Sequence, residues 1–185
     1  MKLALTLALL AALVAAPAAR ADMKLRVGAE AVVASHDVPV KGAGWQGLTD
    51  RFLPSANLMV GWTTPFDILS IDLEVSEQFL TNPGPGENSR QGTTLRPGIT
   101  LSAPLIPIYA RAAIPLHLEP SPFQSYARLG VGLAFNFIAA GVYAEFDADF
   151  PLAGGSQTIN GQTVSAPDAF GQQIFSAGAG LQFKF

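Results

Sequence analysis

Cysteine is absent from this 185-residue chain, and charged side chains make up only 14% of it. The missing cysteine excludes disulfide bonds, thiolate chemistry and cysteine-ligated metals. Soluble domains carry about 25% charged residues, so the low charge indicates an exterior that is not wholly in contact with water. The net charge of −3 also argues against nucleic acid as a partner, because nucleic-acid-binding proteins carry basic patches.

Long apolar helices are also missing beyond residue 21. The most apolar stretch, residues 129–144, is shorter than about 18 residues and contains three glycines and Asn136. In residues 95–116, four prolines would each cost a helix interior about 3 kcal/mol. Both stretches therefore favour strands over membrane-spanning helices.

The first 21 residues have the pattern of a secretory signal peptide. Lys2 gives a positive start, residues 3–16 are apolar apart from one threonine, and residues 19–21 form a small-x-small cleavage site. A membrane anchor would need about 20 apolar residues, and this stretch is broken at Pro17. We predict that residues 1–21 are cleaved and that residues 22–185 form one domain with 9 basic and 14 acidic side chains, a net charge of −5.

Alternation of apolar and polar residues divides the mature chain into eight candidate strands. They are residues 24–33, 56–63, 69–76, 95–102, 108–114, 126–133, 140–149 and 175–185. Pro97 and Pro115 each remove a backbone donor, so we expect a bulge or a strand end near them.

The links between these segments alternate in length. Long polar links span residues 35–53, 81–92 and 151–171, with a shorter one at 117–123, and tight links lie at 64–67, at 104–107 and around Asn136. An even-stranded barrel with short periplasmic turns and longer outer loops has this layout. The Asn160-Gly161 pair in the last long link favours a tight hairpin. The predicted fold is all-β, an eight-stranded antiparallel up-and-down transmembrane β-barrel.

Composition decides which face of the barrel points outward. A soluble barrel would carry many Lys and Glu residues on its exterior, whereas the polar face here consists of Gly, Ser, Tyr, a few Arg and a few acids. Aromatic residues also gather near the ends of the predicted strands, as in the interfacial girdles of membrane barrels. They are Trp62, Phe66, Phe135, Phe137, Phe183 and Phe185 at one rim and Phe79 and Phe150 at the other. The apolar face is therefore predicted to face lipid.

The chain ends on Phe185, with Leu181 and Phe183 on the same strand face. This ending is similar to the signal by which the outer-membrane assembly machinery recognises its clients. The mature chain resembles the small eight-stranded outer-membrane β-barrel proteins of Gram-negative bacteria, of the OmpA-barrel, OmpX or OmpW type. The resemblance implies localisation in the cell outer membrane, with membrane lipid and the assembly machinery as partners, and leaves the partner of the outer loops unknown.

Charged residues on the polar face are expected to pair inside the barrel. Eight strands leave an interior just wide enough for side chains, and an isolated buried charge is very costly. Glu145 is expected to pair with Arg111 or Arg128. The whole predicted network consists of Arg26, Glu30, Asp72, Glu74, Arg96, Arg111, Arg128, Glu145 and Asp147. The alternative is a cation site on Glu145, Asp147 and Asp149, since oxygen ligands at this spacing suit a hard cation, although nearby arginines would compete.

Three functional classes remain open: a structural or interaction barrel acting through its surface loops, a narrow conduit for small or hydrophobic solutes, and a surface lipid hydrolase. The hydrolase would use His36 or His117, both in predicted outer loops, with Ser35 or Ser121 as nucleophile. Neither histidine has the His-x-Ser spacing associated with lipid A deacylase barrels. We expect no enzymatic activity, no metal and no cofactor, and favour the structural or interaction role because the lumen is predicted to be filled.

Overall fold

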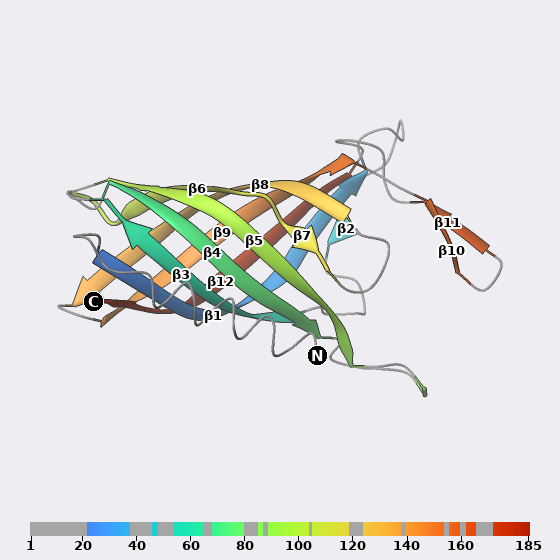
Figure 1. Cartoon of the computed structure of the whole chain (residues 1–185), viewed down its shortest axis with the longest axis horizontal. Helices are drawn as coiled ribbons and strands as arrows, with labels where there is room; N and C mark the ends of the chain where they lie inside the picture. Colours follow the sequence, from blue (N-terminus) through green and yellow to red (C-terminus); the bar gives the residue numbers. More distant parts are fainter. Residues whose placement is uncertain are drawn as a thin grey trace.

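The computed structural model describes residues 22–37, 46–47, 54–64, 68–79, 85–86, 89–103, 105–118, 124–137, 140–153, 156–159, 162–165 and 172–185. Eight long strands form a closed antiparallel barrel (Figure 1). They are β1 (Asp22–Asp37), β3 (Pro54–Thr63), β4 (Leu69–Phe79), β5 (Arg90–Ser102), β6 (Ile108–Ala113), β8 (Gln124–Phe137), β9 (Ala140–Ala153) and β12 (Gln172–Lys184). Each pairs with the next of these strands along the chain, and β12 pairs with β1 to close the wall. The predicted fold class is confirmed.

Four short strands complete the structure. β2 (Gln46–Gly47) pairs with β1, and β7 (Leu116–His117) continues the line of β6 between β5 and β8. β10 (Ser156–Ile159) and β11 (Gln162–Ser165) pair with each other outside the barrel wall, as the Asn-Gly pair between them predicts (Figure 1).

No helix among the described residues has the length and apolar character needed to cross a membrane.

The two ends of the barrel differ in how their strands are joined. At one end, here called the short-turn end, β3 joins β4, β5 joins β6 and β8 joins β9 (Figure 1). β1 begins and β12 ends at this same end. Met23 and Phe185 close the wall at this end through two backbone hydrogen bonds, of 3.1 and 2.9 Å. The opposite end, where the longer links and the β10–β11 hairpin lie, is called the long-link end.

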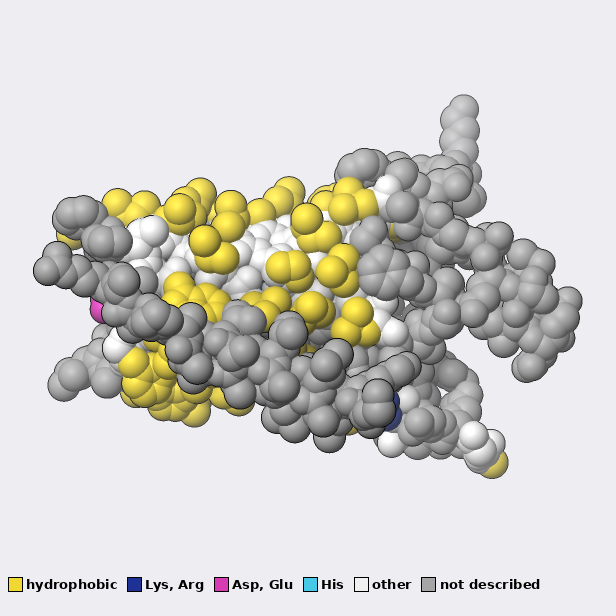
Figure 2. Space-filling model, in the orientation of Figure 1, with side chains coloured by type: hydrophobic (Ala, Val, Ile, Leu, Met, Phe, Trp, Pro, Cys, Tyr) yellow, Lys and Arg dark blue, Asp and Glu magenta, His cyan; other side chains and the backbone are white. Residues whose placement is uncertain are grey.

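Apolar side chains lie over the outside of the barrel (Figure 2). Most of the side chains buried inside it are polar or charged. Neighbours on β4 illustrate the reversal, since Ile71 is 62% exposed and Asp72 only 2%. In water, an apolar exterior around a polar interior would be unfavourable. In a membrane, lipid covers the apolar exterior, so no second layer of protein is needed. The alternation therefore belongs to a membrane-spanning barrel, and the apolar face points outward as the composition predicts.

The strands extend further toward the long-link end than the alternation predicts. β1 reaches Asp37, β5 begins at Arg90 and β9 reaches Ala153. Backbone pairing continues in these extensions, for example between His36 and Gln173. The expectation that His36 and His117 lie in loops is wrong, because His36 lies in β1 and His117 in β7.

Two prolines lie beside the break in the wall between β6 and β7. Pro115 separates β6 from β7, which confirms the strand end expected there, and its carbonyl accepts a hydrogen bond from the Tyr126 amide at 3.0 Å. Pro97 lies within β5, and its carbonyl accepts from the Ile114 amide at 2.9 Å. Since the amide and carbonyl of a strand residue face the same neighbour, the missing donor of Pro97 faces this interruption. The ladder between β5 and β4 therefore continues through Leu73 without a shift.

Candidate functional site: the charged lumen

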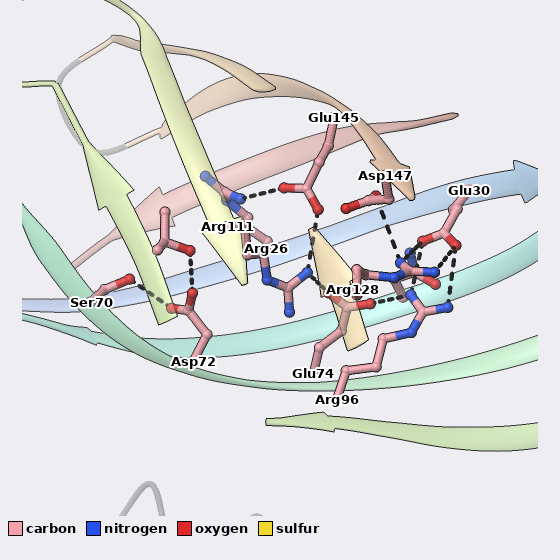
Figure 3. A network of polar contacts seen from close by, with 12 residues as sticks. Arg26, Glu30, Ser70, Asp72, Glu74, Arg96, Arg111, Arg128, Glu145 and Asp147 are labelled. Carbon is pink, nitrogen blue, oxygen red and sulfur yellow. Dashed lines mark hydrogen bonds and ion pairs between the residues drawn. The ribbon is translucent and has the colours of Figure 1, made fainter. Parts of the chain in front are cut away.

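Charged side chains from six strands converge inside the barrel (Figure 3). Each lies on the inward parity of its strand, so the alternation that sends apolar residues to lipid also sends these groups to the lumen. Glu30 comes from β1, Arg96 from β5 and Arg128 from β8, and all three are at most 9% exposed.

Glu30 connects two arginines toward the long-link end. Arg128 donates two hydrogen bonds of 2.9 Å to the two carboxylate oxygens of Glu30. Arg96 donates to the same two oxygens at 2.8 and 3.2 Å. Arg128 also binds both oxygens of Asp149, at 2.7 and 2.5 Å. Bidentate, charge-assisted pairs of this kind are the strongest hydrogen bonds available to side chains.

Glu74 continues the network toward the middle of the barrel. Its two oxygens accept from Arg96 at 2.6 Å and from Arg111 at 2.5 Å. Arg111 then lies 3.3 Å from Glu145, which lies 3.4 Å from Arg26. Acids and bases thus alternate from Arg128 to Arg26, and each charge has an opposite neighbour, as burial requires.

Arg26 lies between two tyrosine rings toward the short-turn end. Its guanidinium carbon is 4.3 Å from the ring centre of Tyr109 and 4.7 Å from that of Tyr143. The rings lie close to the wall because glycines face them. A Cβ at Gly132 would collide with Tyr109, and one at Gly180 with Tyr143.

Asp72 belongs to a separate cluster near Arg26. Ser70 donates to one of its oxygens at 2.7 Å and Thr100 donates to the other. Its cationic neighbour is Lys24, whose Nζ lies 3.7 Å from the Asp72 carboxylate. Asp72 therefore pairs with a lysine, whereas the other acids described above pair with arginines.

The structure places all nine residues of the predicted network inside the lumen. They are Arg26, Glu30, Asp72, Glu74, Arg96, Arg111, Arg128, Glu145 and Asp147, each at most 9% exposed. Glu145 lies by Arg111, one of the two expected partners, but its second neighbour is Arg26, because Arg128 is held by Glu30 and Asp149. Sequence reasoning left out Lys24, which shares the inward parity of Arg26, and used Asp149 only as a metal ligand.

At the alternative cation site, Arg128 occupies the position next to Asp147 and Asp149 that a cation would take. Both oxygens of Asp149 accept from Arg128, and Arg128 also lies 3.6 Å from Asp147. Across the described part of the chain, no group of three or more His, Asp or Glu side chains is placed to hold a metal ion. The Oδ1 atoms of Asp147 and Asn57 have no hydrogen-bond partner, and both residues border a mid-barrel cavity of about 10 Å³. That is room for about one water molecule.

The network divides the lumen into two end cavities. The cavity toward the short-turn end has a volume of about 500 Å³, and the one toward the long-link end about 320 Å³. Between them lies the cavity of about 10 Å³ among Glu74, Arg111 and Glu145. The lumen is thus filled in its middle, as predicted, but open at both ends.

His117 lies at the wall of the long-link cavity. Its Nδ1 is 3.3 Å from the Thr94 hydroxyl, and its ring packs edge-on against Tyr126 with the ring centres 5.0 Å apart. Neither neighbour is a carboxylate that would orient the imidazole as a base. Ser121 and the side chains of Ser35 and His36 lie outside the described residues.

No protein-family model matches the chain, and no curated protein matches it in sequence. Among solved structures, the crystal structure of Neisserial surface protein A (NspA) is similar with a TM-score of 0.51 and 13% sequence identity, over 88% of this chain and 97% of that one. The solid-state NMR structure of outer membrane protein AlkL in DMPC lipid bilayers is similar with a TM-score of 0.47 and 12% identity, over 92% and 93%. At this identity the likeness to NspA is one of fold.

Proposed function

We propose that the protein is an outer-membrane barrel that does not conduct solutes and serves a structural or interaction role through its long-link end. The observation that carries this proposal is the continuous ion-pair network from Arg128 to Arg26, which occupies the middle of the lumen. A solute crossing the barrel would have to separate these buried pairs. Leaving one member of such a buried pair without its partner costs about 3–5 kcal/mol.

Two features support the outer-membrane location. The exterior is an apolar band, and the strands are joined by short turns at one end and longer links at the other, as in bacterial outer-membrane barrels. NspA, whose fold is similar, is named a surface protein. Because the turns of such barrels are short on the periplasmic side, we place the short-turn end in the periplasm and the long-link end on the outside.

The C-terminal strand supports a role for the barrel assembly machinery as a partner. Leu181 in β12 is 52% exposed, and Phe185, directly after β12, is 68% exposed. Phe183 lies between them with the same parity. An apolar, outward-facing strand end that also closes the wall against β1 is a suitable recognition element, because it is available until closure is complete.

A non-catalytic role is part of the proposal. Within the described chain, His117 contacts Thr94 and Tyr126 rather than a serine and an acid. The competing function is a narrow conduit, which the two end cavities would serve if the network between them could open.

Surface display is tested by adding protease to intact cells. The β10–β11 hairpin projects from the barrel at the long-link end (Figure 1). In intact cells, we expect the protease to cleave the protein within residues 154–171, while the barrel fragments remain in the membrane. Cleavage there only after the outer membrane has been permeabilised would contradict the proposed orientation.

A further inference from the structure

Among the described residues, the charged side chains that line the cavity at the short-turn end are all basic. Its basic side chains are Lys24, Arg26 and Lys184, and no aspartate or glutamate of the described chain lines it. The other polar groups around it are neutral: Thr63, Ser102, Tyr109, Asn136 and Gln182. A concave space of about 500 Å³ is within the size range of small-molecule sites.

Lys24 is buried with a weak ionic partner. Its Nζ donates to the neutral Ser70 hydroxyl at 3.0 Å, while the nearest Asp72 oxygen is 3.7 Å away. Both Asp72 oxygens already accept hydrogen bonds, from Ser70 and Thr100. Since an ammonium group has three donors, Lys24 retains capacity for an acceptor in the cavity.

Arg26 is also only loosely paired. Its shortest hydrogen bond, of 2.6 Å, goes to the neutral amide of Gln182, and its contact with Glu145 is 3.4 Å. Arg111 shares that carboxylate. The tyrosine rings beside Arg26 attract the cation without neutralising it. By contrast, Arg128 donates four hydrogen bonds of 2.5–2.9 Å to the carboxylates of Glu30 and Asp149.

The rim of the same cavity is apolar. Leu105 is 96% exposed, Phe137 is 70% exposed and Ile106 is 53% exposed. An inorganic anion would occupy the basic interior and make no contact with these side chains. A molecule with an anionic head and an apolar portion would satisfy both regions.

We propose that the short-turn cavity binds an amphiphile whose head is a phosphate or carboxylate. The head contacts Lys24 and Arg26, and the apolar portion lies on Leu105, Ile106 and Phe137. In the proposed orientation this site opens to the periplasm and the inner leaflet of the outer membrane.

The test uses the refolded ¹⁵N-labelled protein in dodecyl maltoside, a detergent without charge. Decyl phosphate is titrated while the side-chain amide signals of Asn136 and Gln182, which both line the cavity, are followed by NMR. Decanol supplies the same chain without charge, inorganic phosphate supplies the head alone, and sodium decanoate supplies the carboxylate head. We expect saturable shifts with decyl phosphate and decanoate, weaker binding of inorganic phosphate to the same signals, and no saturable shift with decanol.

Three variants make the assignment specific. Lys24→Gln should weaken decyl phosphate about tenfold, because a charge-assisted hydrogen bond is lost. Leu105→Ser, at an exposed position that leaves the fold intact, should weaken decyl phosphate severalfold but leave inorganic phosphate unchanged. Arg90→Gln removes a positive charge at the long-link end and should have no effect.

Equal shifts with decanol would overturn the anionic assignment. Inorganic phosphate binding as tightly as decyl phosphate, or no effect of Leu105→Ser, would overturn the amphiphile. Equal weakening by Arg90→Gln would show that the effect is one of net charge, not of this cavity.

Discussion

Arg128 and Glu30 are joined by two parallel hydrogen bonds of 2.9 Å, although their strands, β8 and β1, are not neighbours in the wall. β9 and β12 lie between them. The pair therefore crosses the lumen instead of lying along its wall. Together with Arg96 from β5, it connects two other strands of the barrel to one carboxylate of β1.

The first prediction concerns that carboxylate. Glu30→Gln keeps the shape of the side chain but leaves Arg96 and Arg128 without a shared charge, so the free energy of unfolding should fall by about 3–5 kcal/mol. Urea unfolding in lipid vesicles measures it.

The matched control is Glu77→Gln. Glu77 pairs with Arg90 at 2.5 Å, but the Arg90 side chain is 48% exposed, so solvent screens the pair. A loss of only about 0–1 kcal/mol is expected. Similar losses for the two variants would mean that burial does not strengthen the lumen network.

A second prediction tests the lipid-facing side of the wall. Val142 is 46% exposed on the outside of β9, so Val142→Arg should reduce stability in a bilayer by about 2–4 kcal/mol. Phe79→Arg, at the long-link end of β4, places the same charge near the membrane surface and should cost about 0–1 kcal/mol. If Val142→Arg is harmless while Glu145→Leu is stabilising, the two faces of the wall have been inverted.

A third prediction concerns the end of β12. Deleting Phe185 removes two backbone hydrogen bonds with Met23, a small part of a wall held by complete ladders. Refolding into detergent should remain nearly intact, whereas insertion in cells should be impaired if Phe185 is an assembly signal.

Phe137→Ala is the control, because Phe137 is an equally exposed aromatic residue at the same end. Membrane fractionation after short induction compares the two. Equal insertion of the deleted and full-length chains would remove Phe185 from the assembly signal.

A fourth prediction concerns the start of the barrel. β1 begins at Asp22, directly after the expected cleavage site. Intact-mass measurement on the outer-membrane fraction should give a chain that starts at Asp22. Recovery of a chain that retains residues 1–21, or of soluble protein in the periplasm, would reject the proposed topology.

Sequence reasoning identified all eight wall strands and which of their faces points inward, because both follow from a period of two. Arg26 and Arg128 are assigned to the lumen in this way without any knowledge of neighbours. Which charged side chains pair with each other inside the lumen does not follow from the period of two. Glu30 reaches Arg96 and Arg128 across strands that are not paired, which depends on the stagger of the closed barrel and on side-chain conformations.

The strand extensions at the long-link end were also beyond sequence reasoning. His36 lies past the last alternating residue of β1, yet its backbone still pairs with Gln173. Outside the apolar band a strand needs no lipid-facing side chains, so hydrophobic periodicity no longer indicates it. The short β7 was missed for another reason: Pro115 interrupts the ladder before it, and two residues cannot show a period.

The central claim is that the ion-pair network seals the lumen, and single-channel recording of the refolded wild-type protein in planar bilayers tests it most directly. Wild type should give no conductance steps, while Glu145→Gln, which weakens the compensation of Arg111 and Arg26 without removing the barrel, should give brief openings. Stable open levels in the wild-type recordings would contradict the sealed lumen and establish a conduit instead.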